Sequence, residues 1–200
     1  FDPLSRLDDV LPVYVELLGR LRAAGAEWVQ IDEPALVSES LPASVAQLSD
    51  AAQRAFAVLG GAADRPSIFV VAPYASLDSV FPVLAAAPVE AIGVDLVRGT
   101  VPAAADGLAD KTLVGGVIDG HNIWRGDLAG ALDTLEQLRG LGAAAVAAST
   151  STSLLHVPHD VTDETKLDER LVSWLAFADQ KVGQVVTLAR GLAAGRDAVA

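Results

Sequence analysis

The chain has 200 residues, of which 52% are hydrophobic and 20% are charged, a composition that suits one folded domain with a sizeable core. Its formal net charge of −12, with no cluster of Lys and Arg to offset it, argues against nucleic acid or an anionic membrane surface as a partner. The absence of cysteine excludes disulfides and thiolate metal sites, and no apolar run approaches the roughly 18–20 residues that cross a bilayer. We therefore expect a cytoplasmic protein with no membrane partner. The start at Phe1 and the lack of methionine predict that the chain is a fragment.

Predicted helices and strands alternate along the sequence. Apolar residues at spacings of three and four predict a helix from Leu4 to Leu21, which Pro12 is expected to bend or split. Short apolar runs predict strands at Trp28–Ile31, Ile68–Val71, Ala91–Leu96, Thr112–Ile118 and Ala143–Ala148. Further helices are expected at Ser44–Leu59, Leu77–Ala86, Pro102–Ala109, Leu128–Leu141 and Lys166–Ala194. The buried face of the last helix is expected to hold Leu167, Leu171, Trp174, Ala178, Val182 and Val185. We expect both Trp124 and Trp174 to pack in the core or between helices rather than to serve as stacking platforms.

This alternation, at about 40 residues a unit, predicts an α/β fold with a parallel sheet. A closed barrel of this kind needs eight units and usually about 250 residues. Residues 1–200 are therefore expected to form a single partial domain, an incomplete (βα)8 TIM-type barrel of about five parallel βα units. Such a sheet has two unpaired edges and an incomplete core, so we expect self-association. The inward side chains are expected to be Val29, Ile31, Phe69, Val71, Val94, Val117 and Ile118.

The residues that end the first strand are candidates for a site. Pro34 has no N–H for a sheet ladder and biases Glu33 away from helical geometry, so the strand should stop at Asp32 and Glu33. In parallel α/β folds, ligands bind at the C-terminal ends of the strands. Two carboxylates in one cleft shift each other's pKa and can act as an acid–base or amine-binding pair. The alternative is that they accept loop N–H groups or form a salt bridge.

Polar residues also follow the third and fourth strands. Asp95 and Arg98 suit either an anion-binding mouth or an ion pair that stabilises their loop. Asp119, His121 and Asn122 have the side chains of a polar substrate contact, although a turn at this point would use the same residue types.

Hydroxyl-bearing residues at 149–153 and a histidine follow the fifth strand. Ser151 and Ser153 can bind phosphate or carboxylate, or can hydrogen-bond locally within a loop. His156 is a candidate substrate contact. His156 and His159 are also of a type that metals accept, but a short His-x-x-His pattern is weak evidence for a metal site. We predict neither a metal site nor a catalytic residue in this chain.

Longer motifs carry a family resemblance. They are Trp28–Leu36 (WVQIDEPAL), Val94–Gly99 (VDLVRG), Gly116–Arg125 (GVIDGHNIWR), Ser153–Pro158 (SLLHVP), Glu164–Asp168 (ETKLD) and Ser173–Ala178 (SWLAFA). In this order and at these spacings the chain resembles cobalamin-independent methionine synthase over its whole length. It departs from the family at His121, where Arg is more common, and at His159, where an apolar residue is more common.

The resemblance implies two barrels, the product of a duplication, that transfer a methyl group from methyltetrahydrofolate polyglutamate to homocysteine. This chain resembles the C-terminal five βα units of the amino-terminal barrel. The resemblance places the catalytic zinc, held by His, two Cys and Glu, in the other barrel. In that barrel the counterparts of Asp32 and Glu33 would hold the homocysteine amino group.

The implied partners are therefore the zinc-bearing C-terminal barrel, folate polyglutamate and homocysteine, and the implied role is scaffold and folate-side wall. One alternative is a purely structural half-barrel. Another, of a different class, is an independent barrel hydrolase or lyase that uses Asp32 and Glu33.

Overall fold

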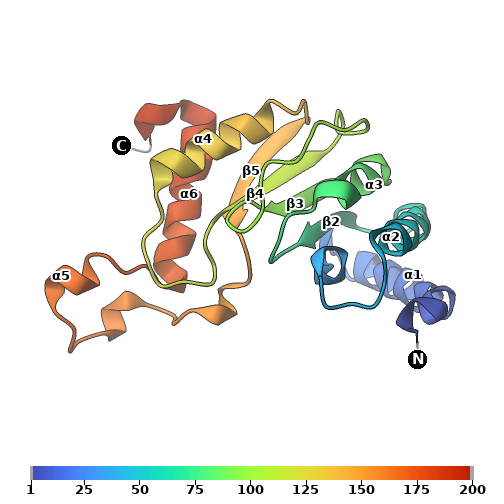
Figure 1. Cartoon of the computed structure of the whole chain (residues 1–200), viewed down its shortest axis with the longest axis horizontal. Helices are drawn as coiled ribbons and strands as arrows, with labels where there is room; N and C mark the ends of the chain where they lie inside the picture. The colour runs from blue at the N-terminus through green and yellow to red at the C-terminus, as the bar shows by residue number, and fades with distance from the viewer. Residues whose placement is uncertain (1, 199–200) are drawn as a thin grey trace.

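A single parallel sheet forms the centre of the computed structural model, which describes residues 2–198 (Figure 1). Its five strands are β1 (Trp28–Asp32), β2 (Ser67–Ala72), β3 (Ala91–Asp95), β4 (Thr112–Ile118) and β5 (Ala145–Thr150). They lie side by side in chain order, and every neighbouring pair is parallel. Within the described residues β1 and β5 are each paired on one side only, so the sheet is not closed. The prediction of an incomplete α/β barrel is confirmed.

Six helices connect and flank the strands. They are α1 (Leu7–Ala23), α2 (Val45–Gly60), α3 (Phe81–Ala86), α4 (Leu128–Arg139), α5 (Glu169–Val172) and α6 (Ala178–Ala194). The start of α2 is fixed by a capping box, in which the Ser44 hydroxyl accepts the Gln47 N–H and the Gln47 side chain accepts the Ser44 N–H. Between residues 2 and 198, no helix is long and apolar enough to cross a membrane.

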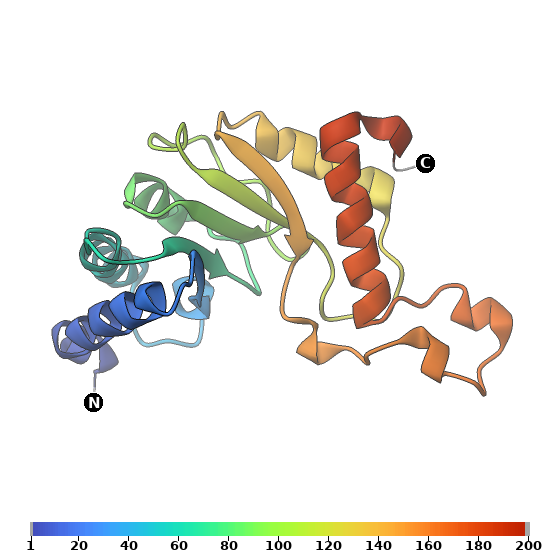
Figure 2. The same ribbon diagram turned by 180° about the vertical axis from the view of Figure 1, so that it is seen from behind.

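The helices pack on one face of the sheet. Strand side chains of that face, such as Ile68, Ile92 and Leu113, are fully buried against α1, α2 and α3. A second cluster joins Ile118 to α4 and to Leu188 of α6 beside β5 (Figure 2). The opposite face carries side chains that belong to none of the described hydrophobic clusters, and these side chains come from Trp28, Gln30, Asp32, Phe69, Val71 and Val114.

The prediction of which side chains point into the barrel was therefore wrong in part. Val29, Ile31, Val94 and Ile118 lie among the helix-packed residues, and only Phe69 and Val71 of the set discussed above lie on the helix-free face. Side chains alternate along a strand, so adjacent strands must be set in register before inside and outside can be distinguished. The sequence alone does not supply that register.

Two local predictions also fail. Pro12 lies inside α1 and does not split it; because Pro12 is exposed, the carbonyl group that it leaves unbonded can be hydrated. The helix expected at Pro102–Ala109 is an irregular segment. Gly107 has a φ of 93°, outside helical geometry, and Leu108 is buried as an anchor.

The long C-terminal helix begins at Ala178 rather than at Lys166. The segment before it is held by the β4–α4 loop, because the Ala176 N–H donates to the Ile123 carbonyl at 2.8 Å. The buried face of α6 is formed by Lys181, Leu188 and Gly191. Of the expected set, Trp174 and Val182 are 51% and 52% exposed, so the prediction of their burial was wrong. Trp124, 48% exposed, is not a core residue either.

Candidate functional site

The C-terminal ends of all five strands lie at one edge of the sheet, which we call the carboxyl edge. Parallel pairing brings together here the loops that follow each strand. These loops carry every candidate residue named from the sequence, which are Asp32, Glu33, Asp119, His121, Asn122, Ser151, Ser153 and His156. The structure divides them into groups with different roles.

Asp95, at the end of β3, is a buried tether. It is 2% exposed, and its carboxylate accepts hydrogen bonds from the backbone N–H groups of Tyr74, Val97 and Arg98 at 3.0, 2.9 and 2.9 Å. The expected ion pair between Asp95 and Arg98 is absent from the described structure, since the carboxylate binds the Arg98 backbone and not its guanidinium. A buried carboxylate is stable when N–H groups satisfy it, and here three of them do. One side chain thus fixes the loops after β2 and β3.

Four side chains from four loops meet above this tether, and we call them the Tyr74 cluster: Tyr74, Arg98, His121 and His156. The Tyr74 hydroxyl lies 3.0 Å from His156 Nε2, and Arg98 Nη2 lies 3.2 Å from His121 Nδ1. The two imidazole rings pack edge to face with centroids 4.1 Å apart. Tyr74 has a φ of 87°, a conformation that costs a non-glycine residue about 1–3 kcal/mol and that is found mostly at functional sites.

Asp119 and Asn122 form a braced loop. The Asp119 carboxylate accepts the His121 N–H and the Asn122 amide, each at 2.7 Å, as a turn requires. Lys181 Nζ donates to the side-chain amide oxygen of Asn122 at 3.4 Å. The same ammonium also donates to the backbone carbonyl of Trp124 at 3.1 Å. Lys181 is fully buried; burial lowers the pKa of its ammonium, and the nearby Asp119 carboxylate opposes that shift. Asp119 and Asn122 therefore bond to neighbours, while His121 is free to join the Tyr74 cluster.

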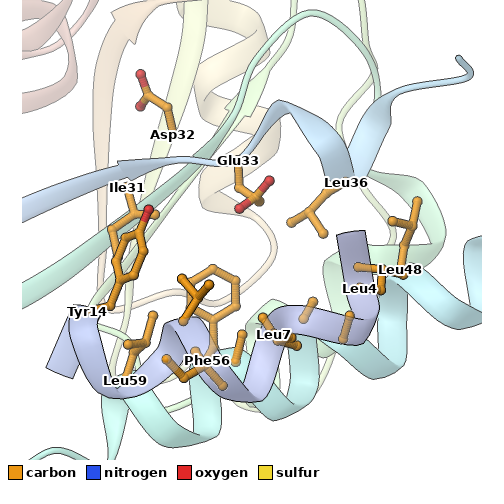
Figure 3. Close-up of a pocket in the computed structure, with 15 residues that line it drawn as sticks. Leu4, Leu7, Tyr14, Ile31, Asp32, Glu33, Leu36, Leu48, Phe56 and Leu59 are labelled. Carbon is orange, nitrogen blue, oxygen red and sulfur yellow. The ribbon is translucent and has the colours of Figure 1, made fainter. Parts of the chain in front are cut away.

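Asp32 and Glu33 lie at the end of β1. Figure 3 shows their carboxylates pointing in different directions, with Glu33 directed into a cavity of about 260 Å³ between α1, α2 and the end of β1. Burial in this mostly apolar cavity raises the pKa of the Glu33 carboxyl, against a smaller lowering by the Ala35 backbone N–H. Asp32 instead accepts a hydrogen bond from Gln30 at 2.7 Å on the other face of the sheet. Both acids line this cavity, but their carboxylates point apart, as adjacent residues of an extended chain do; an acid–base or amine-binding pair stays a prediction.

The hydroxyl run lines a second cavity of about 240 Å³ at the carboxyl edge, together with Asp32 and Tyr74. Ser151 and Thr152 are buried, and the Ser151 hydroxyl accepts the Gly120 N–H at 3.3 Å. Ser153 caps the following turn by accepting the Leu155 N–H at 3.3 Å. The bond of Ser153 lies within its own loop, whereas that of Ser151 joins the loop after β5 to the loop after β4; binding of an anion by these hydroxyls stays a prediction.

A metal site is not apparent in the part of the chain that the structure describes, since no three His, Cys, Asp or Glu side chains are grouped to hold an ion. His159 is exposed and lies 3.7 Å from the Asp179 carboxylate, away from the Tyr74 cluster. His156 bonds to Tyr74 instead.

Sequence reasoning missed two residues of this edge. Tyr74 was not among the candidates, and its position just after the second strand is the one signal that could have identified it. Lys181 gave no signal, because a lysine in an amphipathic helix is expected at the surface.

Comparison with known proteins gives consistent results. Residues 1–143 match the family described as "Cobalamin-independent synthase, N-terminal domain". The curated 5-methyltetrahydropteroyltriglutamate–homocysteine methyltransferase of Streptomyces avermitilis is 50% identical over 205 residues, covering 100% of this chain and 26% of the relative. The protein of the same name from Mycolicibacterium paratuberculosis is 51% identical over 200 residues, covering 99% of this chain and 26% of the relative. The chain thus spans about a quarter of the length of these relatives.

A solved structure shows the same fold. Its title describes a "Putative Vitamin-B12 Independent Methionine Synthase from Listeria monocytogenes". The TM-score is 0.66 at 15% sequence identity, and the match covers 92% of this chain and 54% of that chain. At this identity the likeness shows the fold alone.

Proposed function

Because this chain belongs to the cobalamin-independent synthase family, through its N-terminal domain, we propose that it is part of an enzyme that makes methionine. In this proposal the whole protein transfers a methyl group from 5-methyltetrahydropteroyltriglutamate to homocysteine in the cytoplasm. Residues 1–200 supply the C-terminal five βα units of the amino-terminal barrel. The observation that carries the proposal is about 50% identity, over essentially the whole chain, to proteins named for this reaction.

The role proposed for this piece is scaffold and folate-side wall. This role is supported by the hydrogen bonds of the carboxyl edge, where several polar side chains bond to the chain's own loops. Asp95 is occupied by three backbone N–H groups, and Asp119 and Asn122 are occupied by their own loop and by Lys181. Such groups fix loop shape, and they leave Asp32, Ser153 and the Tyr74 cluster facing the edge as possible substrate contacts.

The zinc ion implied by the resemblance does not fit the described residues. The chain has no cysteine, and the structure between residues 2 and 198 groups no three potential ligands. We therefore propose that the zinc ligands lie in another barrel of the same enzyme, which would be the main partner of this one. No step of the reaction is assigned to a side chain of this piece.

A second candidate function is a purely structural half-barrel that braces the rest of the enzyme. The buried lysines favour it. Lys111 donates to the carbonyls of Ala87 and Val89 at 2.8 and 2.9 Å, and Lys181 ties α6 to the β4–α4 loop. The hydrolase or lyase hypothesis has less support, since the carboxylates of Asp32 and Glu33 point in different directions.

The proposed function is tested by comparing the purified 200-residue chain with the full-length protein. Each is incubated with zinc, homocysteine and 5-methyltetrahydropteroyltriglutamate, and methionine and protein-bound metal are then measured. We expect methionine from the full-length protein only, because activation of a thiol at neutral pH needs a metal held by soft or borderline ligands. Methionine from the chain alone, or stoichiometric zinc that survives a mild chelator there, would place the chemistry in this piece. A full-length protein that makes no methionine would refute the proposed reaction.

A further inference from the structure

The Tyr74 cluster has hydrogen-bond donors that the chain itself leaves without an anionic partner. Arg98, His121 and His156 are exposed at the carboxyl edge. Across residues 2–198, the Arg98 guanidinium takes part in none of the ion pairs between side chains. Its one side-chain hydrogen bond is to His121 Nδ1. The chain has 26 acidic and 14 basic residues. The Arg98 guanidinium nevertheless bonds to the His121 imidazole, which packs against His156, and forms no ion pair with a carboxylate of the described residues.

The contact between Arg98 and His121 selects the tautomer of the neutral His121 ring. A guanidinium has only donors, so His121 Nδ1 must accept, and the proton of the neutral ring is on Nε2. The Tyr74 hydroxyl can donate to His156 Nε2, which leaves the other nitrogen of His156 as a donor. The cluster thus offers N–H groups from three side chains, of which Arg98 hydrogen-bonds to His121 and His121 packs against His156.

The cluster is also held in place before any ligand arrives. The Asp95 carboxylate bonds the backbone N–H groups of both Tyr74 and Arg98. This tether holds Tyr74 at its positive φ, and the strained conformation places the hydroxyl against His156. Ordering the donors in advance lowers the entropy that binding must overcome.

We propose that the Tyr74 cluster is a binding site for an oxyanion, the carboxylate or phosphate group of a ligand, held between Arg98, His121 and His156. A guanidinium fork with flanking imidazole donors suits such planar or tetrahedral oxygens. The site lies where ligands of parallel α/β folds bind. It does not depend on methyl transfer by the whole protein.

The test is titration calorimetry on the full-length protein with two probes, sulfate and an N-acetylated tri-γ-glutamate peptide. In Arg98→Gln we expect affinity for the tighter probe to fall by about tenfold or more, the usual loss for a charge-assisted hydrogen bond. The matched control is Arg22→Gln, which makes the same charge change at the C-terminal end of α1, next to the opposite edge of the sheet.

The two histidines are tested together. The double variant His121→Asn, His156→Asn should bind the tighter probe about tenfold or more weakly than wild type, because it lacks two of the proposed imidazole donors. Thermal unfolding of each variant checks that the fold is kept. A preference for sulfate indicates a phosphate ligand, and a preference for the peptide indicates a carboxylate ligand; either supports the site. Failure of both probes to bind wild type at millimolar concentration would overturn the proposal, as would equal affinities in Arg98→Gln and Arg22→Gln.

Discussion

Replacing Asp95 should destabilise the carboxyl edge, because this one side chain accepts one hydrogen bond from the loop after β2 and two from the loop after β3. In Asp95→Asn, one acceptor oxygen becomes an NH2 donor, so at least one of the three backbone N–H groups faces another donor. Loss of one hydrogen bond to a charged group costs about 1.5–3 kcal/mol of unfolding free energy. In Asp95→Ala all three bonds are lost. At about 1–3 kcal/mol for each unsatisfied N–H, and with water able to reach part of the loop, we expect about 3–5 kcal/mol.

The strain at Tyr74 makes the effect local as well as global. Its positive φ stores about 1–3 kcal/mol, which is released once the N–H is free. The loop after β2 should then leave its present conformation, and the contact between Tyr74 and His156 should be lost. The exchange of the amide protons of Tyr74, Val97 and Arg98 should accelerate together, since one carboxylate protects all three.

Urea denaturation and hydrogen exchange read by mass spectrometry measure the two effects. The matched control is Asp106→Asn, because Asp106 is exposed and its side chain makes no hydrogen bond or ion pair within the described residues. The reasoning is refuted if Asp95→Asn is as stable as this control to within about 0.5 kcal/mol, the usual range for surface changes, and if exchange in the two loops is unchanged.

Three further predictions follow from burial and open edges. Burial raises the pKa of Glu33, so stability is lost as pH rises from about 4.3 through the raised folded value. Glu33→Gln should therefore be more stable than wild type at pH 7 and equal to it below about pH 4 by urea midpoint, and an equal gain at both pH values would contradict this. Lys181 is fully buried, and Lys181→Met keeps most of its side-chain volume. This variant should therefore lose less unfolding free energy than Lys181→Ala, in which the cavity costs about 2–5 kcal/mol. Equal losses of unfolding free energy in the two variants would mean that the ammonium matters more than packing. The isolated chain should self-associate through its one-sided edge strands and the 53% exposed Trp28, and Trp28→Glu should weaken this in sedimentation velocity. A monomer at every concentration would count against that prediction.

The fold could be predicted because its signal is local. Each strand is a short apolar run between turn residues, and all five observed strands begin and end within two residues of the expected positions. The failures lie where distant residues decide. The segment before α6 is held extended by the hydrogen bond from the Ala176 N–H to the Ile123 carbonyl, which overrides a helical pattern. The segment at 102–109 is shaped by Gly107 and the buried Leu108.

The site could be predicted only as a set of residue types at one edge. Topology alone places the end of each strand there, so the polar residues of the five loops were identified together. Their partners could not be identified, because a carboxylate such as Asp95 can bind an arginine or backbone N–H groups, and only the loop geometry selects between them. Lys181 lay outside this reasoning altogether, since nothing in an amphipathic pattern indicates that a lysine is buried.

Asp95 links the stability of the edge to the proposed oxyanion site, and this link separates two kinds of variant. Within residues 2–198 the Arg98 side chain hydrogen-bonds to His121 alone and is exposed, so its loss should remove anion binding and leave unfolding nearly unchanged. Asp95 touches no ligand in the proposed arrangement, yet it fixes the backbones of both Tyr74 and Arg98. Its loss should therefore weaken anion binding and stability together. If Asp95→Asn lowers stability but binds sulfate as wild type does, the donors do not need the tether, and preorganisation by this carboxylate is not the source of affinity.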